Sequence, residues 1–487
     1  MTSSLAMQSV VQAMLCGDEV KAVVADMGAN TSRFGFGGQE SPRHAFRSDI
    51  GLVAGDEASM EVEGSTSKGK ESIRRSDGRR AVLGDLSLRF IRDDMSVEKP
   101  FVVNQGKNGA TINWDHVESI MQYGYTQSMH IDPREYCGLF ADNYFESDAD
   151  KAGLFELCFE KFEQPAAYIM SNASLASFSS GRQTSLVVDF GATQTRVTPV
   201  VDGFVINGGA LRTNRGGDWL DEIVTNVVNN TNKSSSSSSG NSSSSSSSKK
   251  RKASSSAPKR DPIIIKPWFE KDADSIKRYG TCAPSLRELH VRDVIRDLKK
   301  WMIFVPYQKI PDNLRENFIN NVIKLPDYEL PDGSTVTYFD ELCTGPEKLF
   351  IPADGKAPKQ VPRPVVGLPA RAQPTEIDVN TDSLQEIVRA SVLGCDVDCR
   401  KEIMSNVMLV GGGSLIDGMQ QRLADELKTV FPDNVKVKTS VQLPLERTNA
   451  AWIGGSILSI CGSFQQMWIS KQEWLEEGER LLAHRLK

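Results

Sequence analysis

Cysteine and histidine are scarce in this sequence, and both are scattered. The 487 residues include eight cysteines and five histidines. They form no C-x-x-C pair and no cysteine–histidine spacing typical of zinc sites, so neither a zinc centre nor a disulfide framework is expected. Cys395 and Cys399 lie four residues apart and could face together on a helix, and we predict a structural role for them. The scattered histidines indicate no catalytic group.

Long apolar runs are also missing. No run approaches the ~18 apolar residues that a membrane-spanning helix needs, so no membrane contact is expected. The N-terminal MTSSLAMQSVVQAML lacks the basic start of a secretory signal. A formal net charge of −6 gives no argument for direct nucleic-acid binding. Together these absences favour a soluble protein of a reducing, intracellular compartment.

Three stretches lack the pattern of a packed element. Residues 55–80 are polar and contain several glycines, and we predict a mobile loop there. Residues 233–260 are a serine tract followed by KKRKASSSAPKR, which is too polar to bury a core and predicts a disordered insertion. Residues 352–375 are rich in proline and predict a second insertion.

Strands and helices alternate between these stretches. Residues Trp114–Met129, Gly153–Phe162 and Met419–Val430 have helical periodicity. Leu186–Asp189 and Val407–Val410 are short apolar segments typical of buried strands. Alternation of this kind predicts an α/β protein.

One short pattern occurs twice. Residues 23–36 read VVADMGANTSRFGF, and residues 187–200 read VVDFGATQTRVTPV. Each copy runs from apolar residues into Asp-x-Gly-Ala and on to an arginine, which predicts a hairpin whose backbone N–H groups suit phosphate oxygens. Asp26 and Asp189 can hold a divalent cation through water. The pair predicts a nucleotide cleft between two halves of a duplicated fold.

A third candidate site is the glycine-rich stretch LVGGGSLIDG at Leu409–Gly418. A strand that ends in three glycines before a helix lets the backbone approach a flat ligand such as adenosine. The alternative is an ordinary tight turn with no ligand.

Longer stretches resemble actin. The C-terminal run WIGGSILSICGSFQQMWISKQEW, Trp452–Trp474, is similar to the end of actin. Earlier in the chain, NWDHVESI, YELPDG and CDVDCRKEI occur in the same order as in actin. The resemblance covers almost the whole chain except the two insertions. Gly-Asp-Glu-Val at 17–20, the loop at 59–70, Gly-Ala-Thr at 191–193 and a long second-half insertion most resemble the nuclear members of the actin family.

The resemblance implies an actin-like duplicated α/β fold with ribonuclease H-like halves and two lobes of four subdomains around a cleft. Lobe one would be 1–169 plus 449–487, and lobe two 170–448. The implied cofactor is ATP with Mg²⁺ or Ca²⁺ in a structural role. Its metal would be held through water by Asp26 and Asp189. The implied nucleotide contacts are Gly28, Ala29, Asn30, Arg33, Gly191, Ala192, Thr193, Arg296, Lys299, Gly411, Gly412, Gly413, Leu415 and Ile416.

The resemblance also implies weak or absent hydrolysis. Actin-type sites hold the attacking water with a glutamine and a histidine, and the matching positions here are taken as Glu156 and Arg196. Ala29 lacks a hydroxyl, and Ala192 lacks a carboxylate, that the family places near the terminal phosphate. These differences favour an ATP-binding pseudo-ATPase, because phosphoryl transfer depends on positioned groups. Glu156 could still act as a base.

Partners and location follow from the same resemblance. Related nuclear proteins grip a helicase-SANT-associated helix of a chromatin remodeller, or a helix of a histone-acetyltransferase scaffold, with actin beside it. The corresponding residues here are Tyr168, Leu458, Cys461, Ser463 and Met467, for which core packing is the alternative. Contact with histones or nucleosomes is expected by analogy only.

The basic run Lys249, Lys250, Arg251 and Lys252 fits a nuclear-import signal, with a solvated charge run as the alternative. We expect a nuclear protein with a secondary cytoplasmic location.

Two other function classes remain open. One is a polymerising cytoskeletal ATPase like actin, which the altered site and the insertions disfavour. The other is a sugar kinase or heat-shock chaperone with the same duplicated fold. A chaperone would carry a separate peptide-binding domain, and a kinase would need a catalytic carboxylate at a sugar pocket. Neither is evident in the sequence.

Overall fold

The computed structural model describes residues 21–54, 72–103, 110–145, 147–229, 263–307, 327–336, 340–351, 382–431, 437–440 and 442–486. The basic run at 249–252, the insertion 233–260 and the proline-rich stretch 352–375 lie outside these residues. Within the described ranges no helix combines the length and apolar character needed to cross a bilayer.

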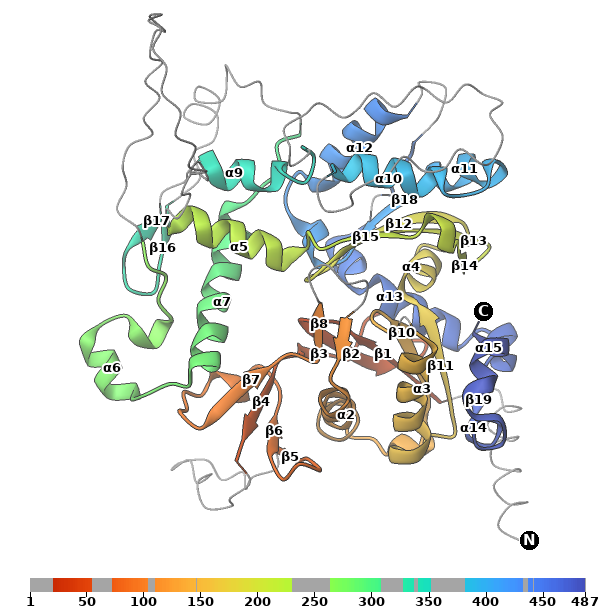
Figure 1. The fold of residues 1–487 in the computed structure, drawn as a ribbon, viewed down its shortest axis with the longest axis horizontal. Coiled ribbons are helices and arrows are strands. Elements are labelled where there is room, and N and C mark those ends of the chain that lie inside the picture. Colours follow the sequence, from red (N-terminus) through yellow and green to blue (C-terminus); the bar gives the residue numbers. More distant parts are fainter. Residues whose placement is uncertain are drawn as a thin grey trace, which may run out of the picture.

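A six-stranded sheet forms the core of the first half (Figure 1). Its apolar residues alternate between two faces, as the period of a strand requires. Val23 and Ala25 pack toward the outer helices, whereas Val24 points to the opposite side and packs with Trp452. In sheet order the strands are β19 (Ile469–Ser470), β11 (Ala166–Ser171), β10 (Cys137–Asp142), β1 (Ala22–Met27), β2 (Thr31–Phe36) and β3 (His44–Arg47).

Helices cover the outer face of this sheet. They bury an aromatic-rich core in which Phe155 stacks with both Phe159 and Trp474. The helices are α2 (Trp114–Gln122), α3 (Asp148–Glu156), α14 (Lys471–Glu477) and α15 (Leu482–Arg485).

A smaller five-stranded sheet forms the core of the second half. Leu186 and Val188 pack toward one set of helices, and Val187 packs on the other side. The strands are β14 (Phe204–Val205), β13 (Thr195–Val201), β12 (Ser185–Phe190) and β18 (Val407–Val410), with β15 (Leu211–Thr213) beside β13. The covering helices are α5 (Gly217–Val228), α10 (Leu384–Leu393), α11 (Val397–Met404) and α12 (Met419–Val430).

The two sheets repeat one topology. In the first, β1 pairs antiparallel with β2 and parallel with β10. In the second, β12 pairs antiparallel with β13 and parallel with β18. The prediction of a duplicated α/β arrangement agrees with this repeat.

Two helices lie between the sheets, α4 (Asn172–Ser179) and α13 (Pro444–Ser459) (Figure 1). They cross closely because Gly454 has no side chain: a Cβ there would lie 1.7 Å from the carbonyl oxygen of Leu175. The crossing joins the inner faces of both sheets through Ala173 and Ala450 on one side and Ala451 on the other.

A smaller unit extends from each half. The first is a four-stranded sheet in the order β5 (Ser72–Arg74), β6 (Arg80–Val82), β4 (Ile50–Val53) and β7 (Met95–Glu98), near the hairpin β8 (Phe101–Val103) and β9 (Ala110–Ile112). The second contains α6 (Ala273–Tyr279), α7 (Pro284–Met302), α9 (Asp340–Glu347), β16 (Tyr328–Glu329) and β17 (Thr335–Val336).

The element predictions fare unevenly. The strand Val407–Val410 and the helix Met419–Val430 have the predicted bounds. The helix predicted from Trp114 consists of α2 and a π-helical turn that ends at Ser128. The prediction of one loop over 55–80 is wrong for its C-terminal part, because residues 72–74 form a strand that pairs with residues 80–82. Arginines in both segments interrupt the apolar pattern that predicts a strand, although Ile73 and Ala81 are buried.

Candidate functional site

The two Asp-Gly hairpins have the same register. Asp26 on β1 stands opposite Arg33 on β2, and Asp189 on β12 stands opposite Arg196 on β13. Each turn is closed by a glycine N–H, from Gly28 to the Thr31 carbonyl at 3.1 Å and from Gly191 to the Gln194 carbonyl at 2.9 Å. A Cβ on either glycine would meet that same carbonyl oxygen at 2.9–3.0 Å, so the tight turns favour glycine.

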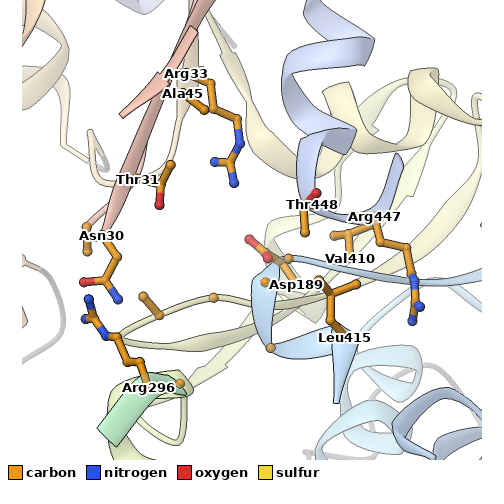
Figure 2. A pocket seen from close by; sticks show the side chains of 18 of the residues that line it. Asn30, Thr31, Arg33, Ala45, Asp189, Arg296, Val410, Leu415, Arg447 and Thr448 are labelled. Atoms are coloured by element: carbon orange, nitrogen blue, oxygen red, sulfur yellow. The ribbon is translucent and has the colours of Figure 1, made fainter. Parts of the chain in front are cut away.

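The hairpins face one cavity of about 860 Å³ between the two halves (Figure 2). Figure 2 shows Arg33 and Thr31 on one side, Asp189 on the other, and Arg296 from α7 at a third edge. Of the predicted contacts, the lining includes Asp26, Gly28, Ala29, Asn30, Arg33, Asp189, Gly191, Ala192, Arg296, Lys299, Gly411, Gly412, Gly413, Leu415 and Ile416. Lys300 and Thr448 line it too.

The glycine-rich stretch after β18 has a packing role as well as a place at the cavity. Gly411 adopts φ +87°, and a Cβ on Gly413 would lie 1.9 Å from the ring of Phe190. Backbone therefore lies directly against β12, and Leu415 follows it into the cavity wall. The stretch forms a tight turn and also lines the cavity, and its contact with a ligand stays a prediction.

One carboxylate from each half lies at the cavity, Asp26 buried and Asp189 partly buried. Asp26 accepts from the Asn143 amide at 2.7 Å and pairs with Arg33 at 3.2 Å. Arg33 also donates to Asn449 at 2.8 Å, which fixes its guanidinium. Burial raises the pKa of Asp189 to about 6, although the nearby Arg196 opposes the shift.

Burial disfavours the ionised form of Asp189 in spite of the neighbouring Arg196 and Arg33, and a bound cation would stabilise that form further. The described residues contain no group of three or more His, Cys, Asp or Glu side chains able to hold a metal by themselves. Mg²⁺ commonly uses one or two carboxylates together with water and substrate phosphates. Asp26 and Asp189 fit that limited donor set.

Basic side chains at the cavity are partly neutralised. Arg296 contacts Asp218 at 3.3 Å and Asp221 at 3.4 Å, and Lys299 pairs with Asp221. Asp218 also holds Lys99 at 2.9 Å. These pairs position the cations for a ligand while reducing their net charge.

Two predicted residues lie elsewhere. Thr193 is not part of the lining; its hydroxyl contacts Tyr144 at 3.0 Å, which ties the second hairpin to the first half. The prediction that Glu156 lies at the hydrolytic position is wrong. Glu156 is exposed at the end of α3, a helix that packs on the outer face of the sheet, and it does not line the cavity.

Asn172, at the start of α4, does line the cavity, and the sequence interpretation missed it. Its amide donates to Asp189 at 2.8 Å. Its position in the sequence could have indicated this role. Asn172 follows β11 directly, at the carboxyl end of the strand, where ligand sites of α/β proteins usually lie. Arg196 lines the cavity as well, and its guanidinium lies 5.3 Å from the ring centre of Tyr144.

The small sheet and α7 meet at the rim of the cavity. We call this meeting the interlobe contact; its apolar part is Val53, Val82, Leu88 and Met95 against Ala283, Leu286 and Leu289. Arg47 binds both oxygens of Asp293 at 2.9 and 3.0 Å, and both residues line the cavity. The Val97 amide donates to Ser285 at 2.8 Å. The contact thus joins the two halves at the rim of the cavity, where Arg47 and Asp293 belong to the lining and the leucines do not.

The predicted partner residues cluster at one end of α13. Tyr168 is buried with its ring 5.2 Å from Phe464, and Leu458 and Cys461 pack half-buried on the same cluster. Ser463 and Met467 are exposed beside them. The core-packing alternative therefore applies to Tyr168, whereas Met467 is available on the surface.

Comparison with known proteins agrees with this architecture. A family model described as Actin matches residues 17–487. The chain is 30% identical to actin-related protein 4 of Arabidopsis thaliana over 474 residues, covering 96% of this chain and 98% of the relative. It is 30% identical to actin-related protein 4 of Oryza sativa subsp. indica, with the same coverage, and 27% identical to that of Schizosaccharomyces pombe, covering 96% and 97%. The chain therefore belongs to the actin family, with the actin-like fold that its sequence predicts.

Proposed function

We propose that this protein is a nuclear, non-polymerising subunit of chromatin-remodelling and histone-acetyltransferase complexes that binds ATP with Mg²⁺ in its cavity for structural purposes. The observation that carries the nucleotide part is the meeting of two equivalent Asp-Gly hairpins, one from each sheet, across one cavity. The similarity to actin-related protein 4 over almost the whole chain supports the functional class.

The chain's own residues have separable tasks in this proposal. Backbone N–H groups of the hairpin turns would bind phosphate oxygens, and Asp26 and Asp189 would orient the cation's water shell. Mg²⁺, when bound, neutralises phosphate charge. Leu415 and Ile416 would cover the base. A ligand that touches both halves favours the closed arrangement and stabilises the folded state.

Mg-ATP is expected to raise the melting temperature of nucleotide-stripped protein. A ligand at a thousand times its Kd adds about 4 kcal/mol to the free energy of unfolding. Asp189→Ala should remove most of this shift because it removes a metal-orienting carboxylate, whereas Asp274→Ala, an exposed residue of α6, should leave it unchanged. Differential scanning fluorimetry with and without millimolar Mg-ATP measures both. Absence of a shift in the unaltered protein would refute nucleotide binding.

Hydrolysis is expected to be slow or absent. Asn172 and Arg196 can position water or stabilise charge, but an amide and a guanidinium are poor proton acceptors. In a single-turnover assay the bound ATP should persist well beyond the time that it lasts in actin filaments. Glu156→Ala should not alter phosphate release, because Glu156 is exposed and outside the cavity. Rapid release, or release abolished by Glu156→Ala, would contradict this account.

The surface around Met467 is proposed to bind an amphipathic helix of a remodeller or acetyltransferase scaffold, with actin beside it. Met467 is 39% exposed, and Ile457 and Ile460 lie exposed nearby in sequence. Met467→Asp should weaken capture of a helicase-SANT-associated helix by about tenfold or more, since it places a charge in an apolar contact. Leu475→Asp, an exposed leucine on α14, is the matched control. Equal capture by a folded Met467→Asp variant would exclude this surface.

Nuclear import through Lys249–Lys252 is the proposed route to the nucleus, with a cytoplasmic pool as the second location. A fluorescent reporter that carries the segment should accumulate in nuclei, and an even distribution would count against an autonomous signal.

Direct contact with histones or nucleosomes remains a proposal from the resemblance. Failure to pellet under actin-polymerising conditions would separate the proposal from a cytoskeletal ATPase.

A further inference from the structure

An exposed row of aromatic and basic side chains lies on the unit that contains α6, apart from the cavity. Trp268 and Tyr279 meet edge to face with ring centres 5.0 Å apart, and the Arg278 guanidinium lies 5.6 Å from the Tyr279 ring centre. Trp268 is 41% exposed and Tyr279 38%. We call Trp268, Arg278 and Tyr279 the aromatic row. Tryptophan, tyrosine and arginine are the residues that dominate the energy of protein interfaces.

Contacts of the neighbouring residues Phe269 and Glu270 fix the position of the aromatic row. Phe269, next to Trp268, is buried and lies 5.4 Å from the ring of buried His290 on α7. The carboxylate of Glu270 binds Arg287 through two hydrogen bonds of 2.6 and 2.7 Å. Side chains fixed before a partner arrives lose little conformational entropy on binding. This arrangement suits a docking surface better than it suits a loosely exposed loop.

The helix that carries the row is also defined at both ends. The carboxylate of Asp272 caps α6 by accepting from the Ser275 amide at 2.7 Å. Gly280, at φ +73°, ends the helix directly after Tyr279. The apolar surface continues on this helix through Ile276, which is 51% exposed and one turn before Tyr279.

Two cations at the row are unpaired within the part of the chain that the structure describes. Among the described residues, neither Lys277 nor Arg278 has an ion-pair partner within 4.0 Å. Lys266 and Lys271 have only loose partners, at 3.8 and 3.9 Å. Residues 266–279 carry four lysine or arginine side chains and three carboxylates, of which Glu270 pairs with Arg287. An apolar surface with unpaired cations at its border complements an acidic partner.

We propose that the aromatic row docks an acidic peptide segment that presents an aliphatic or aromatic side chain to Trp268 and Tyr279. The apolar side chain would contact the rings while carboxylates pair with Lys277 and Arg278. Nucleic acid is the less suitable partner, because phosphodiester binding usually involves a basic track longer than the four cations at 266–278. The inference does not depend on nucleotide in the cavity.

The test uses the full chain and a fluorescein-labelled synthetic peptide of glutamates interrupted by leucines and one phenylalanine. Fluorescence polarisation at low salt should show saturable binding that weakens as salt is added. Trp268→Ser and Arg278→Glu should each raise the Kd about tenfold or more. Trp301→Ser is the matched control for the aromatic change, since Trp301 is 65% exposed on α7. Arg134→Glu controls for charge, because the Arg134 side chain is 63% exposed elsewhere.

The outcomes are distinct. Loss of binding in the two row variants alone, with partial recovery in Trp268→Tyr and unchanged melting temperatures, supports the proposal. Three results would overturn it: no binding at millimolar protein, equal losses in the control variants, or tighter binding of a labelled single-stranded oligonucleotide through the same residues. The last result would assign the surface to nucleic acid instead.

Discussion

Replacing Leu286 by alanine is expected to accelerate release of a cavity-bound nucleotide by on the order of a hundredfold. Leu286 is completely buried in the interlobe contact. Truncating a buried leucine costs ~2–5 kcal/mol, and ~3 kcal/mol acting on the opening step corresponds to about 10² in rate. Chasing a fluorescent ATP analogue with excess ATP measures the rate directly.

The polar part of the interlobe contact should matter less. Side chains of Arg47 and Asp293 are 19% and 36% exposed, and ion pairs at such positions contribute ~0–1 kcal/mol. Arg47→Gln is therefore expected to change the release rate only severalfold. Leu445→Ala, at an exposed leucine of α13, provides a control without effect. If a folded Leu286→Ala variant released nucleotide at the original rate, buried leucines would not control opening.

Replacing Gly454 by alanine is expected to lower the free energy of unfolding by on the order of 3 kcal/mol. Alanine is the better helix former by ~1 kcal/mol, so helix propensity alone predicts stabilisation. Packing should prevail, because the new Cβ would lie 1.7 Å from the Leu175 carbonyl oxygen and one of the two helices between the sheets would have to move. Chemical denaturation gives the difference in unfolding free energy.

Gly462→Ala is the matched control, since a Cβ at Gly462 has open space around it. It should leave stability unchanged. A Gly454→Ala variant as stable as the original protein would show that α4 and α13 can separate readily, and the crossing would then not be the rigid joint between the two halves.

The local parts of the site could be predicted from the sequence, and its long-range parts could not. The hairpins and the strand before the glycine turn were predictable because β-branched residues, an aspartate and a glycine follow one another within a few positions. The pairing of Arg47 with Asp293 joins residues 246 positions apart, and no local pattern indicates it. The aromatic row was also missed, because Trp268 and Tyr279 are separated in the sequence and meet only in the folded chain.

The error at Glu156 lies in the match to actin. The resemblance assigned Glu156 to the position of the water-holding glutamine, but a side chain that reaches the cavity must lie near the carboxyl end of a strand. Asn172 occupies such a position after β11, whereas Glu156 lies on a covering helix. Position relative to the sheet would have discriminated between the two.

The interlobe contact also affects how quickly occupancy of the cavity can respond to a change in the free ligand concentration. If the proposed nucleotide is released only when the interlobe contact opens, a nucleotide enclosed during folding would outlast many changes in its free concentration. Occupancy would then reflect the ATP level at the time of folding rather than the present one. Molecules that folded empty would be the less stable ones and the first degraded. The surviving population would thus be uniformly loaded, and insensitive to the energy state of the cell.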